Sequence, residues 1–143
     1  MSRYAAVHRD STGPGDGRPT ALQIVADEGR LGKLRGAVAL VTGCARGNLG
    51  FATAQALYAN GAEVYVTLRG TRGATELVDD LSRSCCSSHT TGTVSVLPLR
   101  LDCLESVREC AQEFQRQSTA LHLLILNAGG EKGPCLSIRR YAC

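Results

Sequence analysis

The sequence is poor in aromatic residues and has no dense run of like charge. Aromatic side chains make up 4% of its 143 residues, and tryptophan is absent, so the platforms on which nucleic-acid bases stack are missing. The net charge of +3 comes from 16 basic and 13 acidic side chains, which gives no indication of a nucleic-acid partner. No apolar stretch approaches the roughly 20 residues of a membrane-spanning helix.

The cysteines also exclude some classes of site. There are seven of them, and none stands in Cys-x-x-Cys spacing or beside a pair of histidines, so we expect no zinc site. Several fall within predicted strands or helices, where a reduced cysteine behaves as a small apolar residue. That pattern fits a reducing compartment. The N-terminus lacks the apolar core of a secretory signal, and we therefore expect a cytoplasmic protein.

What is present is the composition of an ordinary globular domain, with 43% apolar and 20% charged residues. We expect three regions. Residues 1–35 read as a flexible N-terminal extension, because residues 11–19 have the composition of a linker. Residues 36–130 read as one domain, and residues 131–143 as an irregular tail without a helical stripe.

Within the domain, short apolar runs alternate with segments of helical period. The pattern predicts strands over residues 37–41, 63–68, 93–99 and 121–126, and helices over residues 50–59, 72–83 and 104–117. The apolar stripes of the second and third helices consist of Ala74, Leu77, Val78 and Leu81, and of Leu104, Val107, Ala111 and Phe114. Helices between successive strands indicate an α/β fold with right-handed crossovers and a parallel sheet. The expected strand order is 3-2-1-4, the first half of a doubly wound fold.

A glycine-rich turn lies between the first predicted strand and the first predicted helix. Gly43 allows a tight turn, Gly47 removes a side chain where the backbone approaches phosphate, and Gly50 allows the helix to pack closely on the strand. A strand, this turn and a helix are the layout of a dinucleotide phosphate site, where a helix N-terminus meets a pyrophosphate. The alternative is a purely structural turn.

Three motifs give the sequence a family resemblance over about residues 34–130. The segment Thr42–Gly50 resembles the Thr-Gly-x-x-x-Gly-x-Gly motif of the short-chain dehydrogenase/reductases, and Leu126–Gly129 is similar to their Asn-Ala-Gly motif. Leu101-Asp102 follows the third strand, where this family places an acid that contacts adenine. The resemblance implies the cofactor-binding half of an NAD(P)-binding Rossmann-like fold, with about four parallel strands and helices on both faces.

From the motifs and the charges we expect one set of cofactor-binding residues and no catalytic or metal residues. The set is Thr42, Gly43, Arg46, Gly47, Asn48, Leu49, Gly50, Arg69, Asp102, Cys103, Asn127, Ala128 and Gly129. The turn departs from the family at one point, because Asn48 and Leu49 both stand where one residue is usual. Asn tolerates a left-handed backbone, so the extra residue is either absorbed locally or distorts the pyrophosphate cradle.

Two arginines favour NADP over NAD as the cofactor. Folds that choose NAD usually place an acid after the second strand to hold the ribose 2′-hydroxyl, whereas Arg69 stands there in this sequence. Arginine pairs well with a 2′-phosphate. Arg46 stands where NADP-preferring members of the family often carry a basic residue. The alternative is that both side chains are merely solvated.

Two of the other candidate residues have competing structural roles. Asp102 could act as the N-cap of the following helix, a role that is compatible with an adenine contact. Asn127 could bond the backbone of its own loop. In the family, its position helps to fix the sheet near the cofactor ribose.

The catalytic residues of the family are absent from this sequence. Members transfer hydride with a Ser and a Tyr-x-x-x-Lys pair, in which Tyr is the general acid or base. The lysines are Lys33 and Lys132, and neither lies four residues after a tyrosine. Ser137 is too close to the fourth strand to match the family serine, and Tyr141 has no lysine partner. We therefore expect a truncated chain without activity of its own.

The sequence leaves three functions open. The first is the NADP(H)-binding portion of an oxidoreductase that transfers hydride between nicotinamide and a carbonyl or alcohol. The second is a non-catalytic NADPH-binding or regulatory protein that pairs with a full-length relative. The third is a fragment without function. The fourth strand would be an apolar, uncovered edge, so we expect homo- or hetero-oligomers or marginal stability.

Overall fold

The computed structural model describes residues 3–9, 11–13, 15–83 and 92–129. Its helices are α1 (Ala5–Arg9), α2 (Ala21–Asp27), α3 (Leu49–Ala59), α4 (Ala74–Arg83) and α5 (Leu104–Gln117). Its strands are β1 (Val38–Val41), β2 (Glu63–Leu68), β3 (Thr93–Pro98) and β4 (Leu123–Ile125). From β1 onward strands and helices alternate, as the sequence pattern predicted, and the bounds of β2 and α5 agree with the expected ones. The predicted tail at residues 131–143 lies outside the described residues, as do residues 84–91.

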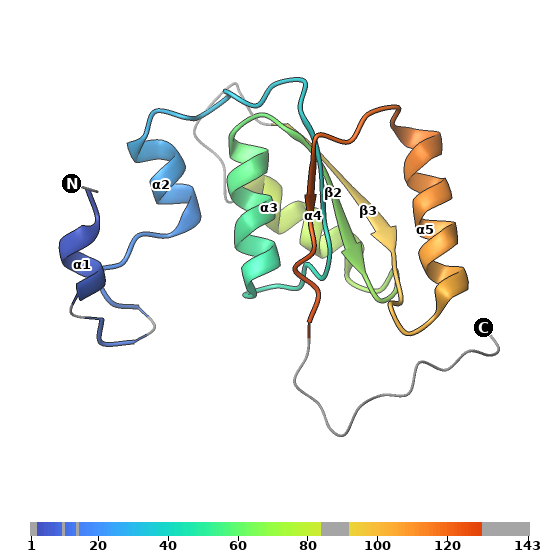
Figure 1. Ribbon diagram of the computed structural model, residues 1–143, viewed down its shortest axis with the longest axis horizontal. Helices are drawn as coiled ribbons and strands as arrows, with labels where there is room; N and C mark the ends of the chain where they lie inside the picture. The colour runs from blue at the N-terminus through green and yellow to red at the C-terminus, as the bar shows by residue number, and fades with distance from the viewer. Residues whose placement is uncertain (1–2, 10, 14, 84–91, 130–143) are drawn as a thin grey trace.

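The strands form one parallel sheet in the order β3-β2-β1-β4 (Figure 1). This is the predicted order. β1 is central, and all four of its residues are buried, because helices lie on both sides of it. A continuous apolar run is what such a doubly covered strand requires.

The core has two layers, one on each face of the sheet. α3 and α4 pack on one face, where Ala54 and Leu81 meet Val64 of β2. α5 packs on the other face, where Phe114 meets Tyr65 edge-on, with ring centroids 4.9 Å apart. Successive residues of a strand point to opposite faces, so the neighbours Val64 and Tyr65 belong to different layers.

The helix faces agree with the predicted stripes in α4 and differ in α5. In α4, Leu77 and Leu81 are buried. In α5, the predicted stripe is wrong at Leu104, which is 55% exposed, and at Ala111, which is also exposed. The buried residues of α5 are Cys110 and Phe114. The predicted stripe omitted Cys110, which lies one helical turn before Phe114 on the buried face.

The N-terminal region contains two helices where the sequence pattern predicted no element. Thr20 caps α2 by accepting a hydrogen bond from the backbone N–H of Gln23, and α2 lies against α3 (Figure 1). Leu34 packs on the α3 layer of the core, and its backbone N–H donates to the carbonyl of Asn60 at 2.8 Å. The end of this region is therefore attached to the C-terminal end of α3.

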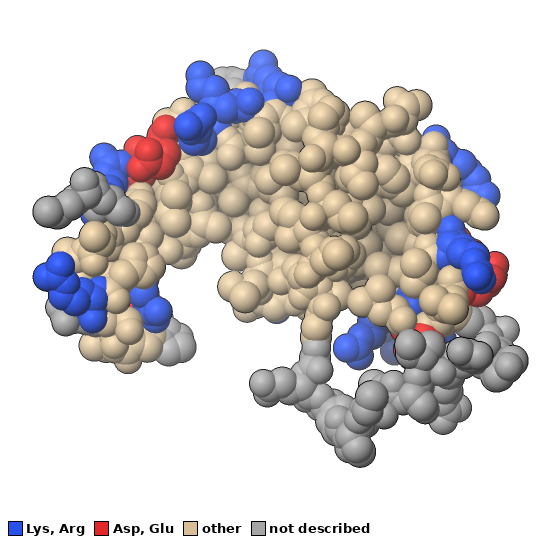
Figure 2. All heavy atoms as spheres, viewed as in Figure 1, with Lys and Arg blue, Asp and Glu red and all other residues tan. Residues whose placement is uncertain are grey.

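β4 is an edge of the described sheet and is poorly covered. Leu123 is 37% exposed, Leu124 is 54% exposed and Leu126 is 78% exposed. Figure 2 shows no Lys, Arg, Asp or Glu over the middle of this face, where β4 lies in Figure 1. An apolar strand edge of this kind is a surface on which another strand can pair. Among the described helices, none is long and apolar enough to cross a membrane.

Candidate cofactor site

The glycine turn and the Asn-Ala-Gly segment meet at the carboxyl ends of β1 and β4. The side-chain amide of Asn127 donates to the carbonyls of Thr42 and Gly43 at 3.0 and 3.1 Å. The backbone N–H of Ala128 donates to the Thr42 hydroxyl at 3.0 Å. Thr42 and Asn127 are far apart in the sequence, so these bonds join two of the three predicted motifs into one unit. The side chain of Asn127 therefore bonds to the end of β1 and the glycine turn, and only its backbone N–H bonds within its own segment, to the carbonyl of Ile125.

Two of the glycines are required because there is no room for a side chain. At Gly43, an added Cβ would lie 2.7 Å from the Cα of Ala128, and the backbone is left-handed, with φ +71°. At Gly50, it would lie 2.7 Å from the carbonyl oxygen of Gly43 and 2.5 Å from the Asn127 amide. The close helix-to-strand packing expected of Gly50 is therefore present.

Asn48 absorbs the extra residue of the turn as the N-cap of α3. Its side-chain oxygen accepts from the backbone N–H of Phe51 at 2.9 Å and of Ala45 at 3.3 Å, and its amide donates to the Gly43 carbonyl at 2.9 Å. The backbone of Asn48 is extended, with φ −98°, so the expected reason, tolerance of a left-handed backbone, is wrong. Gly47 takes the left-handed conformation instead, with φ +76°.

Thr67 of β2 is a supporting residue that the sequence analysis missed. Its hydroxyl accepts a hydrogen bond from the backbone N–H of Gly43 at 3.1 Å, and its carbonyl accepts from the N–H of Cys44 at 3.1 Å. Thr67 is 2% exposed. The available signal was a threonine hydroxyl near the carboxyl end of β2, at the edge of the sheet where the turn lies. Burial beneath the same turn raises the pKa of the Cys44 thiol to about 12, so this cysteine is protonated at neutral pH.

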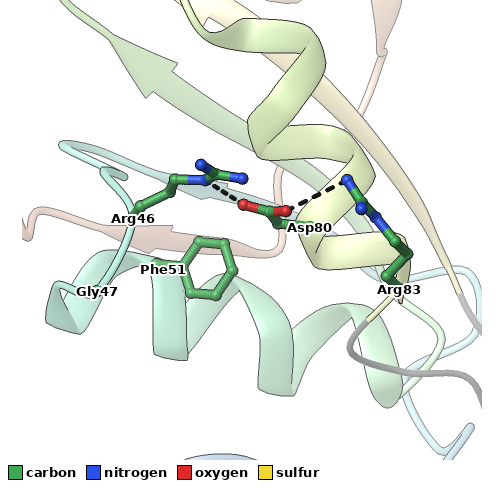
Figure 3. Close-up of a pocket in the computed structure, with 5 residues that line it drawn as sticks. All are labelled: Arg46, Gly47, Phe51, Asp80 and Arg83. Carbon is green, nitrogen blue, oxygen red and sulfur yellow. Dashed lines mark hydrogen bonds and ion pairs between the residues drawn. The ribbon is translucent and has the colours of Figure 1, made fainter.

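Arg46 leaves the turn toward α4 rather than into free solvent. Its Nε pairs with the Asp80 carboxylate, and Arg83 approaches the other oxygen of that carboxylate at 3.4 Å (Figure 3). The hydrogen bond between Arg46 and Asp80 raises the pKa of Arg46 and lowers the pKa of Asp80. The three side chains border an open hollow of about 490 Å³ together with Gly47 and Phe51.

Arg69 and Asp102 lie at the same edge of the sheet, after β2 and β3. Both are exposed. Asp102 pairs with Arg100 at 3.3 Å, and this hydrogen bond, together with the more distant charge of Arg69, lowers the pKa of Asp102. Asp102 is not the N-cap of α5, because Cys103 holds that position and its sulfur accepts from the N–H of Ser106.

Two of the described cysteines, Cys44 and Cys110, are free thiols and are buried. Each belongs to one layer of the core, where it serves as a small apolar residue. Across the described residues, no three His, Cys, Asp or Glu side chains are grouped so that they could hold a metal ion.

The geometry of the turn fits a dinucleotide phosphate. The N-terminus of α3, an 11-residue helix, carries partial positive charge next to the turn. At Gly47 an added Cβ would meet nothing within 4 Å, so the backbone faces open space there and a ligand can approach it. Leu49, the first residue of α3, is 79% exposed. The N-terminal end of α3 is therefore open to solvent and not covered by the core.

Comparisons with known proteins agree with this geometry. The sequence model of the family described as short chain dehydrogenase matches residues 37–140. The chain is 35% identical over 127 residues to the short-chain dehydrogenase/reductase prx1 of Penicillium rubens, covering 89% of this chain and 35% of that protein. It is 36% identical over 132 residues to the oxidoreductase calI of Penicillium decumbens, covering 90% of this chain and 37% of that protein. The chain thus spans little more than a third of the length of these relatives.

Solved structures of dehydrogenases also resemble this chain. A short chain dehydrogenase from Mycobacterium smegmatis superposes with a TM-score of 0.59 at 28% identity, covering 68% of this chain and 39% of that one. A hydroxysteroid dehydrogenase from Escherichia coli shares the fold, with a TM-score of 0.57 at 23% identity and coverage of 68% and 38%. The motifs, the sheet order and these matches all agree. This chain belongs to the short chain dehydrogenase family, and that membership implies a nicotinamide dinucleotide, NAD or NADP, as the cofactor.

Proposed function

We propose that this chain is the NADP(H)-binding part of an oxidoreductase that transfers hydride between nicotinamide and a carbonyl or alcohol. In this proposal residues 36–130 form the binding unit, with the thirteen positions named in the sequence analysis around the cofactor. The observation that carries the proposal is the joined turn, in which Asn127 and Ala128 bond to Thr42 and Gly43. The expected cytoplasmic location stays a prediction.

Each group of residues has a separate task in this proposal. The turn around Gly47 and the N-terminus of α3 bind the pyrophosphate. Arg46 and Arg69 bind the 2′-phosphate, because a guanidinium suits phosphate oxygens in charge and geometry. Asp102 contacts the adenine, and Asn127 holds the sheet ends together beneath the ribose. The bound nicotinamide would supply the hydride chemistry.

We further propose that these 143 residues bind the cofactor without catalysing hydride transfer on their own. A general acid or base within reach of the substrate is needed for that reaction. The sequence contains four tyrosines, and neither of its lysines lies four residues after one of them. Catalysis would therefore require residues that this sequence does not contain.

A titration of the 143-residue chain with NADPH and NADH tests the proposal. We expect NADPH to bind about tenfold or more tightly, since one charge-assisted hydrogen bond contributes roughly 1.5–3 kcal/mol. Adenosine 2′,5′-bisphosphate and adenosine 5′-monophosphate form a matched pair that isolates the 2′-phosphate. Equal affinities within each pair would contradict the NADP preference, and no binding of any of the four would contradict the cofactor site itself.

The exposed edge favours a second property, association with another polypeptide strand. Leu124 registers with Leu40 of β1 and is 54% exposed, although its partner is buried. We propose that β4 pairs with a second copy of this chain, whereas the sequence-based alternative is a full-length relative. Such pairing would cover the apolar edge and satisfy its backbone groups.

A further inference from the structure

Asp80 of α4 stands between two arginines beside the glycine turn. Arg46 reaches it from the turn, and Arg83 reaches it from the last turn of α4 (Figure 3). The Arg46 side chain is 62% exposed and that of Asp80 is 24% exposed. Phe51 of α3 lies close to the pair in the same view. Neither the glycine motif nor the helical pattern of α4 requires an acid at this position.

We propose that Asp80 tunes the cofactor preference by competing with the 2′-phosphate for the guanidinium of Arg46. This inference rests on the proposed function, in which Arg46 binds that phosphate. Before cofactor binds, the Asp80 carboxylate holds Arg46 against α4. When NADP(H) binds, Arg46 exchanges the carboxylate for the phosphate. Asp80 therefore weakens NADP(H) binding while leaving NAD(H) binding unchanged, because NAD(H) carries no 2′-phosphate.

The exposure of the pair makes this exchange feasible. Ion pairs at the protein surface are weak, since water and salt screen both charges. A phosphate carries more charge than a carboxylate and offers three acceptor oxygens. The guanidinium of Arg46 thus has a stronger anion available once the cofactor is bound.

The second arginine makes the exchange less costly for Asp80. Arg83 lies 3.4 Å from the carboxylate oxygen that Arg46 does not use, so Asp80 retains a cationic partner after Arg46 leaves. The hollow of about 490 Å³ that these side chains border provides space for Arg46 to rotate. Arg83 and the hollow both lie in the described part of the chain, and neither depends on where the nicotinamide or adenine ring binds.

Replacing Asp80→Asn in the 143-residue chain tests the competition. We expect NADPH to bind about two- to fivefold more tightly to the variant, which is the range that a surface ion pair supplies. The affinity for NADH should stay as in the wild type. Asp79→Asn is the matched control, because it removes the same charge from the same helix and Asp79 forms no ion pair in the described part of the chain.

A second measurement follows Arg46 directly. The Nε–H of Arg46 bonds to Asp80, so its NMR resonance should move much further when NADPH is added than when NADH is added, because only NADPH carries the 2′-phosphate that replaces Asp80. Unchanged or weaker NADPH binding by Asp80→Asn, or the same gain in Asp79→Asn, would overturn the inference. If one of these outcomes is found and the wild type still binds NADPH more tightly than NADH, only the role of Asp80 is wrong and the proposed function stands. If the wild type also lacks that preference, the role of Asp80 and the proposed NADP(H) binding are both wrong.

Discussion

Arg69 follows β2 directly, at the position where an acid would bind the ribose 2′-hydroxyl of NAD. Replacing Arg69→Asp puts a negative charge beside the proposed 2′-phosphate and removes the donor. We expect NADPH affinity to fall about tenfold to a hundredfold, from the loss of one charge-assisted bond, and NADH affinity to change little. Calorimetric titration with both cofactors measures the ratio.

The control for this substitution is Arg116→Asp, which reverses an exposed charge near the C-terminal end of α5. That end lies away from the carboxyl edge of the sheet. Equal losses for NADPH and NADH in Arg69→Asp, or the same selectivity change in Arg116→Asp, would count against the assignment of Arg69.

At the residue scale, the positions that have no room for a side chain were easier to predict from the sequence than the pairs of side chains that interact. The tight turn predicted at Gly43 and the close packing predicted at Gly50 are both present, because the lack of a Cβ is visible in the sequence itself. The pairing of Arg46 with Asp80 was missed, since it joins residues from separate elements. Asp102 was considered as a possible cap of α5 because carboxylates are common caps, whereas Cys103 takes that place in the structure.

At the scale of elements, the start of α3 depends on the side chain of Asn48, which bonds to three backbone groups. Asn48→Ala removes all three bonds, and we expect the free energy of unfolding to fall by about 1 kcal/mol, within a range of roughly 0.5–2. Asn48→Asp keeps both acceptor interactions and adds negative charge at a helix N-terminus, so it should lose less. Urea denaturation of both variants and the wild type measures the difference. A larger loss in Asn48→Asp would show that the amide donor to Gly43 matters more than the cap.

The elements themselves were largely predictable, and their ends followed tertiary contacts. β2 has the bounds that its apolar and β-branched run indicated, because it is hydrogen-bonded on both sides. β4 is shorter than the apolar run at residues 121–126, because in the described sheet only β1 pairs with it. α2 was not predicted at all, since a short helix is stabilised by what it packs on, and that neighbour lies in α3.

At the scale of the whole molecule, we expect the exposed β4 edge to govern self-association of the chain. We expect concentration-dependent self-association of the wild type, and we expect Leu124→Lys to shift it toward monomer, because a charge at a strand edge opposes pairing. Sedimentation velocity at several concentrations measures the shift. Leu101→Lys is the control, since Leu101 is 58% exposed and follows β3 at the opposite edge of the sheet.

A monodisperse wild-type monomer with a sharp, reversible melt would contradict the prediction of an associating edge. An equal shift in Leu101→Lys would contradict the assignment to β4, because it would indicate a general effect of added charge on solubility.

The bonds from Asn127 and Ala128 to the turn have a consequence for biosynthesis. The Thr42–Gly50 signature leaves the ribosome before residue 127. Gly43 already has Thr67 and Asn48 as partners at that stage, whereas the bonds from Asn127 and Ala128 to Thr42 and Gly43 form only after residue 128 arrives. A nascent chain therefore carries the complete signature, without the bonds from β4, while residues 51–127 are being synthesised. Affinity for the cofactor should appear late and abruptly, when the fourth strand joins the sheet, rather than grow with chain length.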